Sequence, residues 1–582
     1  MRFAKTRTPT AIGREVAQKP KKGGMGGGLV PGTYPPPVTM RPQLIGEKFA
    51  VVAGHPLVSA VAMSVFEAGG NAVDAGVAAG IASNVIQVDM ANFGGIAPIL
   101  IRNSGSSQAM SIAGVGRWSQ TVTLEAMVSR HGGRLPLGGA PCIVPGAPAG
   151  WLAALAKAGT MSFADVAGPA LDYARKGFLV DPGLALSLEI CSEGFGQWPS
   201  SVEVYRPGDV PLRAGDRLTQ PALANTLERL VQAENRAKGS RDRGIRAAHD
   251  EFYSGEIAHI MSSTVEENGG FMAPDDFSRF EAEVEPAPSI ESLGWRVHST
   301  PSWSQGPVAL QILGILNRRP GTWHDIVEAT TRAFCDREDF LADPESMERD
   351  LEQLLAEDYL DALAASIGDQ ASLGRATLAG GADGTLGSTT SIVTMDNTGC
   401  TFAASPSDTL DGGPIIPELG ILCSPRGVQS RLSADHPNRL RPGGRPVITP
   451  APIIATRDDE AWAVTCPGGD VIVQAMAQVM WRVMTTDTNL QEAVEAPRIA
   501  AFNVPSAFHP HPSGDRLVFA EGRISAEEQE DLRTRGHNVQ PWPNFEFDAG
   551  SVQTIRSELN SEGERFLAMG ADPRRLAYAM AR

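Results

Sequence analysis

The spacing of apolar and polar residues predicts a mixture of strands and helices in the first part of the chain. Residues 49–53 (FAVVA) form a short apolar run typical of a buried strand, and residues 57–66 continue with helical spacing that ends at a Gly-Gly pair. Asn71 is placed to cap a second helix, whose side chains are small all round and suit burial between layers. The runs 97–102 and 108–112 predict a β-hairpin.

The second half of the chain contains an unusual junction. Residues 324–341 and 346–368 have helical patterns, and a Gly-rich passage follows over 372–388. Two strands, TTSIVTM and CTFAAS, come directly after it and are separated by a tight turn. An accessible segment that runs straight into a threonine on a strand is what a self-cleaving precursor needs.

Composition and charge limit the partners that the chain can bind. The 582 residues are 42% hydrophobic and 20% charged, which is typical of a globular protein. A net charge of −17 argues against nucleic acid or an anionic membrane as a partner. No window is apolar enough for a transmembrane helix, and the six scattered cysteines lack metal-binding spacing. We therefore expect a cytoplasmic protein with reduced thiols.

The N-terminal stretch has a different character. Residues 1–22 are basic, and residues 23–37 read GGMGGGLVPGTYPPP, which can form neither a signal helix nor a strand. We expect residues 1–45 to be a flexible or surface-draped leader rather than a secretory signal.

Thr389 is the candidate nucleophile. An N-terminal threonine supplies both a hydroxyl that attacks and an α-amino group that takes the proton, but the amino group exists only after the bond between Ser388 and Thr389 is cut. Amide N–H groups at Gly468 and Gly469, in the sequence PGG, are suited to bind the developing oxyanion. Taken alone, both features are weak evidence, and an ordinary strand start and an ordinary turn explain them better.

Other candidate sites are weaker. His509 and His511 are each followed by proline, and a loop explains them better than a metal site. The Gly-rich leader lacks the GK[ST] ending of a phosphate-binding loop, and no GxSxG motif is present. Cys466 could be a reactive thiol but is better explained as a packed one. We expect neither a metal nor a cofactor.

From about residue 48 onward the chain resembles the γ-glutamyltranspeptidase family. The resemblance rests on ordered matches: GHPLVSAVAMSVFEAGGNAVDAGVAA (54–79), VPGAPAGW (144–151), NGGFMAPDDFSRFEAEVEP (268–286), ATTRAFCDREDFLADPE (329–345), TTSIVTMDNTG (389–399), CPGGDVIVQAMAQV (466–479) and ADPRR (571–575). It implies an α+β fold, an αββα four-layer sandwich, built from a large subunit (46–388) and a small subunit (389–582) of one self-cleaved precursor. By resemblance, Thr389 is the catalytic threonine, Ser407 its supporting hydroxyl, and Gly468 and Gly469 the oxyanion-binding pair.

The chain departs from the family where γ-glutamyl substrates are held. The arginine that grips the substrate α-carboxylate falls at about Ala113, and paired serines fall at Ile448 and Thr449. The acid that binds the amino group falls within SPRGVQS (424–430), and histidine is commonly found where this chain has Ser391. The remaining candidates for substrate contacts are Thr390, Thr449, Arg426, Gln429 and Arg117.

These departures favour family chemistry on a different acyl group, namely hydrolysis or transfer of a small amide or N-acyl compound. Two alternatives stay open: a genuine γ-glutamyltransferase or glutathione hydrolase, and an unprocessed, inactive member that acts as a binding protein. The expected partners are the small-molecule substrate and the two subunits themselves, and assembly into a homo-oligomer is left open.

Overall fold

The computed structural model describes residues 38–375 and 388–582. The chain divides into two compact units, Met1–Val38 and Thr39–Arg582, and everything below concerns the second. Residues 1–37 of the expected leader lie outside the described residues, as does most of the Gly-rich passage before Thr389. The expectation of a leader up to residue 45 is wrong at its end, because Leu44 and Ile45 belong to strand β1 (Leu44–Gly46), which pairs with another strand.

The first of two large sheets is antiparallel and has the order β21-β2-β10-β11-β3-β4-β7. Its strands are β2 (Phe49–Ala53), β3 (Ala97–Arg102), β4 (Met110–Gly114), β7 (Val284–Pro286), β10 (Ile392–Asp396), β11 (Thr401–Ala404) and β21 (Tyr578–Ala581). The hairpin β10–β11 inserts between β2 and β3, so strands that follow Thr389 pair on both sides with strands that precede it. A cut before Thr389 would leave the two pieces sharing one sheet.

The second large sheet is also antiparallel, with the order β1-β20-β19-β15-β14-β9-β8. Its strands are β1 (Leu44–Gly46), β8 (Ser289–Ser292), β9 (Trp295–Ser299), β14 (Ile453–Arg457), β15 (Glu460–Thr465), β19 (Gln553–Leu559) and β20 (Arg565–Ala571). Apolar side chains from both sheets meet in one buried layer, for example Val52 and Val393 from the first sheet and Ile454 and Ile555 from the second. The two sheets are therefore stacked face to face.

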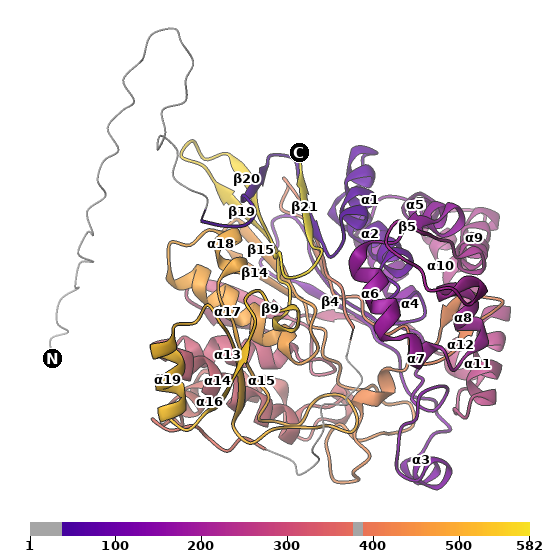
Figure 1. Ribbon diagram of the computed structural model, residues 1–582. Coiled ribbons are helices and arrows are strands. Elements are labelled where there is room, and N and C mark those ends of the chain that lie inside the picture. The colour runs from indigo at the N-terminus through magenta and orange to yellow at the C-terminus, as the bar shows by residue number, and fades with distance from the viewer. Residues whose placement is uncertain (1–37, 376–387) are drawn as a thin grey trace, which may run out of the picture. The chain divides into compact units, whose positions relative to one another are not determined.

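Helices cover the outer face of each sheet (Figure 1). The first sheet packs against α1 (Pro56–Glu67), α2 (Ala72–Ile86) and α4 (Ala147–Ala158), and α5 (Phe163–Lys176), α9 (Pro221–Arg236) and α10 (Arg241–Tyr253) pack on these helices and on one another. The second packs against α13 (Gly306–Leu316), α17 (Val471–Thr485) and α18 (Leu490–Glu495), and α14 (Trp323–Phe340) packs on α13. The four layers confirm the αββα sandwich.

The shorter elements complete the architecture. The remaining helices are α3 (Leu124–His131), α6 (Pro182–Ile190), α7 (Ser192–Phe195), α8 (Pro199–Tyr205), α11 (Glu256–Glu267), α12 (Pro274–Ser278), α15 (Leu351–Leu354), α16 (Glu357–Ala365) and α19 (Ala526–Thr534), with 3₁₀ turns η1 (Pro207–Asp209), η2 (Pro344–Ser346), η3 (Arg426–Gln429) and η4 (Phe547–Ala549). Small sheets are formed by β5 (Phe178–Leu179) with β6 (Arg217–Leu218), β12 (Ile415–Ile416) with β13 (Ile421–Leu422), and β16 (Ile499–Ala501) with β17 (Leu517–Glu521) and β18 (Asn538–Trp542). In the described part of the chain, no helix combines the length and the apolar character needed to cross a bilayer.

Most of the expected elements are present, and one differs. Asn71 caps α2 through its side chain, and the strand and hairpin predicted at 49–53 and 97–112 correspond to β2, β3 and β4. The single helix expected over 346–368 is instead two short ones, α15 and α16, because Asp350 and Ala356 have extended backbone and each starts a new helix.

Candidate active site

The hairpin β10–β11 brings Thr389 opposite Ser407. Thr389 forms an isolated antiparallel bridge with Ser407, and the amide of Thr390 donates to the carbonyl of Pro406 at 2.9 Å. Ser407 is also bridged to Ile96, the residue directly before β3. Both hydroxyl-bearing residues are buried, with at most 1% of their surface exposed. Backbone pairing on both sides therefore fixes these two side chains relative to one another.

Three polar groups converge on the peptide bond between Ser388 and Thr389. The hydroxyl oxygens of Thr389 and Ser407 lie 2.9 Å apart. The Ser407 hydroxyl donates to the Ser388 carbonyl at 2.6 Å, and Arg426 Nη2 donates to the same carbonyl, also at 2.6 Å. Arg426 Nη2 lies 2.7 Å from Ser407 Oγ as well. The threonine that the sequence singled out thus sits in a compact polar cluster around its own peptide bond.

The Gly468-Gly469 turn lies between β15 and α17 and has a backbone shape that favours glycine. Gly468 has φ of 135° and Gly469 has φ of 57°, both in the left-handed region. Their carbonyls accept from the amides of Val471 and Ile472 in the first turn of α17. Within residues 38–375 and 388–582, no acceptor is recorded for the amide N–H of either glycine. Two unengaged N–H groups at a helix N-terminus are suited to bind negative charge.

Phe508 connects this turn with Arg426. A methyl group placed on Gly469 would lie 3.5 Å from Cε2 of Phe508. The Arg426 guanidinium carbon lies 5.6 Å from the centroid of the same ring. Because Arg426 contacts the Ser388 carbonyl, Phe508 and Arg426 link the glycine turn to the peptide bond before Thr389.

The other substrate-contact candidates are placed differently from one another. The Thr390 hydroxyl donates to Gln87 Oε1 at 2.8 Å, and Gln429 Nε2 donates to the Thr449 hydroxyl at 3.3 Å. Gln429 also lines a small cavity together with Ala507, the neighbour of Phe508. Arg117 is engaged elsewhere: its guanidinium is 2.9 Å from both Asp343 and Glu283. To reach Thr389, Arg117 would have to break these ion pairs.

Four further residues shape the site and were not anticipated from the sequence: Gln87, Asp408, Asp470 and Phe508. Asp408 follows Ser407, and its Oδ1 lies 4.0 Å from Arg426 Nε. Burial, only partly offset by the charge of Arg426, raises the pKa of Asp408 to about 6. Asp470 directly follows the glycine turn, a position that could have signalled a role; Gln87 and Phe508 are on separate segments and carry no local motif.

Cys466, next to the glycine turn, is a packed thiol. It is fully buried, and burial raises the pKa of its thiol to about 11, so the thiolate is scarce at neutral pH. All six cysteines are unpaired. The loop with His509 and His511 is half-buried rather than solvated, and His511 Nδ1 lies 3.0 Å from the Ser506 carbonyl.

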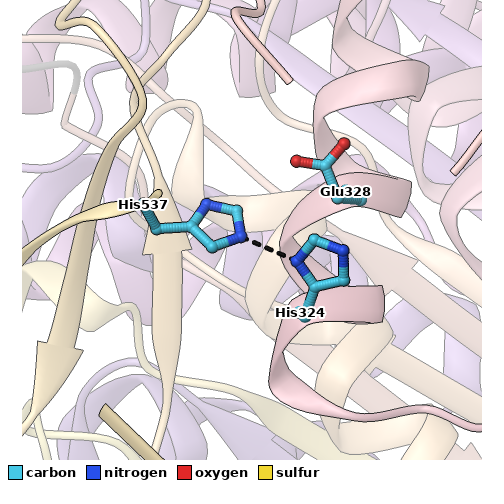
Figure 2. A group of neighbouring side chains, drawn as sticks. All are labelled: His324, Glu328 and His537. Atoms are coloured by element: carbon cyan, nitrogen blue, oxygen red, sulfur yellow. Dashed lines mark hydrogen bonds between the residues drawn. The ribbon is translucent and has the colours of Figure 1, made fainter. Parts of the chain in front are cut away.

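His324, Glu328 and His537 bring three groups of metal-ligand type together (Figure 2). His324 Nε2 lies 2.9 Å from the Gly368 carbonyl, which only accepts, so this nitrogen carries a proton and Nδ1 is free to accept. Nδ1 lies 2.9 Å from His537 Nε2. Two imidazole ligands of a tetrahedral metal would be about 3.3 Å apart, so this is a hydrogen bond between neutral rings. Burial and the neighbouring His324 lower the pKa of His537 to about 4, in keeping with a neutral ring.

Glu328 extends this cluster toward the segment that precedes Thr389. Its Oε1 accepts from the amide of Ser372 at 3.0 Å, while His324 holds Gly368. The cluster thus anchors the segment 368–372 to α14, and we interpret it as structural.

The αββα layers, with a threonine paired to a serine at the start of an inner hairpin, are the architecture of the N-terminal-nucleophile hydrolase class. The chain belongs to the γ-glutamyltranspeptidase family, whose sequence profile matches residues 58–581. This family consists of amide hydrolases and acyltransferases, many of them made as proenzymes.

Three relatives illustrate the range of the family. The glutathione hydrolase-like YwrD proenzyme of Bacillus subtilis (strain 168) is 28% identical over 551 residues, which cover 92% of this chain and 98% of the relative. The oxamate amidohydrolase proenzyme of Klebsiella pneumoniae is 29% identical over 541 residues, covering 90% and 96%. The crystal structure of cephalosporin acylase from Bacillus halodurans matches with a TM-score of 0.82 at 26% identity, covering 95% of this chain and 99% of that one.

Proposed function

We propose that the chain is a self-processing amidohydrolase or acyltransferase in which Thr389, freed by cleavage after Ser388, is the nucleophile. The observation that carries the proposal is the 2.9 Å contact between the hydroxyls of Thr389 and Ser407, with the Ser388 carbonyl bound in the same cluster. The nucleophile (Thr389), the neighbouring hydroxyl (Ser407) and the peptide bond to be cut therefore lie next to one another, as self-cleavage requires. The precursor would separate into residues 1–388 and 389–582.

Each residue has a defined part in the proposed turnover. The Thr389 hydroxyl attacks the amide carbonyl of the substrate and its own α-amino group takes the proton. Ser407 orients the attacking oxygen through the 2.9 Å contact. The amide N–H groups of Gly468 and Gly469 bind the oxyanion. The amine leaves, and water or an acceptor amine then releases the acyl group from Thr389.

In this proposal the acyl group is small and non-glutamyl, and it carries a carbonyl oxygen or a carboxylate next to the reacting carbonyl. Cleavage removes the Ser388 carbonyl from Arg426, which leaves a buried guanidinium facing Thr389. A guanidinium in such a site favours an anionic or carbonyl-bearing acyl group. The similarity to an oxamate amidohydrolase supports this substrate class, since oxamate has a carboxylate beside its amide.

One alternative has specific support, and a second stays open. The similarity to glutathione hydrolase proenzymes favours a γ-glutamyl substrate, which would need a replacement for the missing α-carboxylate clamp. An unprocessed binding protein remains the third option.

Electrophoresis and N-terminal sequencing test the proposal. The wild-type chain of 61.5 kDa should separate into pieces of about 41 and 20 kDa, and the smaller one should begin Thr-Thr-Ser-Ile. Thr389→Ala should stay whole, while the matched control Thr390→Ala should still be cut, because its hydroxyl faces Gln87. A single intact wild-type band would overturn self-processing and favour the binding-protein alternative.

A further inference from the structure

Arg426 and Ser407 hold the carbonyl oxygen of Ser388 from two sides. The two donor atoms, Arg426 Nη2 and Ser407 Oγ, are each 2.6 Å from that oxygen. Arg426 lies in the 3₁₀ turn η3, and only 2% of its surface is exposed. An ordinary backbone carbonyl before a strand does not need a buried cation, so this contact requires an explanation.

The directions of the hydrogen bonds around Ser407 are determined by its single proton. A serine hydroxyl donates once and accepts twice. Arg426 Nη2 can only donate to Ser407 Oγ at 2.7 Å, and the Ser388 carbonyl can only accept. The contact between Thr389 and Ser407 is then a bond donated by the Thr389 hydroxyl. The Thr389 oxygen is thereby left with lone pairs for attack, and its proton points toward Ser407.

Arg426 is not simply the partner of a buried carboxylate. Asp408 Oδ1 lies 4.0 Å from Arg426 Nε, which is beyond hydrogen-bonding distance, and Nε has no hydrogen-bond partner among the described residues. The hydrogen bonds that Arg426 does form go to Ser388 and Ser407. The positive charge of Arg426 is thus directed at the Ser388 carbonyl oxygen, in a site of low polarity where it acts strongly.

We propose that Arg426 and Ser407 form the oxyanion-binding pair of the self-cleavage step, separate from the Gly468-Gly469 turn that serves substrate turnover. This inference rests on the proposed function, namely that the chain cuts itself before Thr389. The Thr389 hydroxyl attacks the Ser388 carbonyl carbon, and negative charge collects on the oxygen that Arg426 and Ser407 bind.

The step balances without a cofactor. The hydroxyl proton ends on the Thr389 nitrogen as the Ser388–Thr389 C–N bond breaks, which gives an ester between Ser388 and the Thr389 oxygen. Water then hydrolyses the ester to a Ser388 carboxylate, the Thr389 hydroxyl and a free α-amino group. Arg426 touches the reacting oxygen throughout and is therefore a catalytic residue of this step.

The rate of self-cleavage tests the assignment. Wild type, Arg426→Gln and Arg426→Lys are synthesised in a cell-free system, and the conversion of precursor to the two pieces is followed on gels. Removing one oxyanion donor typically slows a reaction 10²- to 10³-fold, so Arg426→Gln should be cut at least about 10²-fold more slowly than wild type. Arg426→Lys keeps the charge but moves the donor atoms, and should be about 10-fold slower or more.

A matched control separates this role from a general effect of changing a buried arginine. Arg445 is equally buried, is paired with Glu283 and Asp343, and Arg445→Lys should be cut at close to the wild-type rate. Thermal unfolding of uncut Arg426→Gln, compared with uncut Thr389→Ala, shows whether the variant folds. If Arg426→Gln fails to fold, the rates of self-cleavage of Arg426→Lys and Arg445→Lys are compared instead. Equal rates for these two variants would overturn the role of Arg426.

The outcomes distinguish the two proposals. An uncut wild-type chain overturns self-processing, and with it the inference. A wild-type chain that is cut, together with a folded Arg426→Gln that is cut equally fast, overturns the role of Arg426 and leaves the proposed function intact.

Discussion

Arg337 Nη1 and Asp470 Oδ1 form a buried ion pair at 2.6 Å, which ties the residue after the Gly468-Gly469 turn to helix α14. The same carboxylate accepts from Gln305 Nε2 at 2.6 Å and from the amide of Ala507 at 2.9 Å. Three segments thus converge on Asp470, and they hold the turn at a fixed distance from Phe508 and Arg426. The position of the two glycine amides is set by this carboxylate.

The first prediction concerns this connection. Asp470→Asn should lower kcat/KM about 10- to 100-fold, because it loosens the turn without touching the substrate, and sub-ångström misplacement is costly in catalysis. Self-cleavage should be affected less, since it depends on Arg426. The control is Asp339→Asn, which changes an aspartate that lies on α14, the helix of Arg337, and pairs with Arg375 at the surface. Equal kinetics for the two variants would show that the ion pair does not position the turn.

A second prediction concerns the glycines directly. Gly468→Val and Gly469→Val place a β-branched residue at φ of 135° and 57°, so the backbone must shift and displace the N–H donors. Turnover of the mature enzyme should fall about 10²-fold or more. Gly168→Val, where an added side chain meets nothing within 4 Å, is the control. Steady-state kinetics on the cut enzyme measures the effect, and unchanged kcat would make the turn purely structural.

These variants and Arg426→Gln should have opposite phenotypes. The glycine variants should be cut normally and turn over poorly, whereas Arg426→Gln should be cut slowly. A slow cut in the glycine variants would mean that one oxyanion site serves both steps.

The fold was largely predictable because its signals are local. The strand at 49–53, the cap at Asn71 and the hairpin after Thr389 are read from short patterns, and the structure confirms them. The helix over 346–368 was misjudged because nothing in its composition marks the breaks at Asp350 and Ala356.

The site was predictable only where a motif carries it. Thr389, Ser407 and the glycine turn were identified by resemblance, and the structure places them around one region. Phe508 and Asp408 could not be anticipated, because their roles depend on contacts with Gly469 and Arg426, which are distant in the sequence. The effect of Arg426 on the Ser388 carbonyl likewise needs coordinates, since only direction and distance distinguish it from a structural arginine.

A third prediction concerns pH and Asp408. Burial raises the pKa of Asp408 to about 6, above the value of 3.8 expected for an unfolded aspartate, so the folded state binds the proton more tightly. This stabilisation is complete below about pH 4 and is lost as pH rises through about 6. The loss is on the order of 3 kcal/mol. The Asp408→Asn variant has no carboxyl group at this position, so its stability does not have this dependence on pH.

Thermal unfolding between pH 4 and 7 measures the difference. Both proteins should carry Thr389→Ala, so that a single uncut species is compared. The stability of the parent relative to Asp408→Asn should decline over that range, and parallel stability curves would contradict a raised pKa at Asp408.

The last prediction concerns specificity. Ala113 and the absence of an acid in 424–430 leave no charged cradle for an amino-acid head group, and Arg117 is held by Glu283 and Asp343. Losing one well-paired charged contact costs roughly 2–5 kcal/mol, so kcat/KM for γ-glutamyl-p-nitroanilide should be at least about 10²-fold below that for the best small amide. Oxamate, malonamate and neutral amides of the same length form the comparison set, each assayed with fully cut enzyme.

A preference for the acidic amides that disappears in cut Arg426→Gln, with KM rising more than kcat falls, would assign substrate binding to Arg426. Efficient release of glutamate that is lost in Arg117→Ala would instead mean that Arg117 leaves its ion pairs to clamp the α-carboxylate, and would establish the γ-glutamyl alternative. Gln429→Ala then tests whether the acyl group reaches the neighbouring cavity, which Gln429 lines, and Thr449→Ala tests the hydroxyl that Gln429 binds.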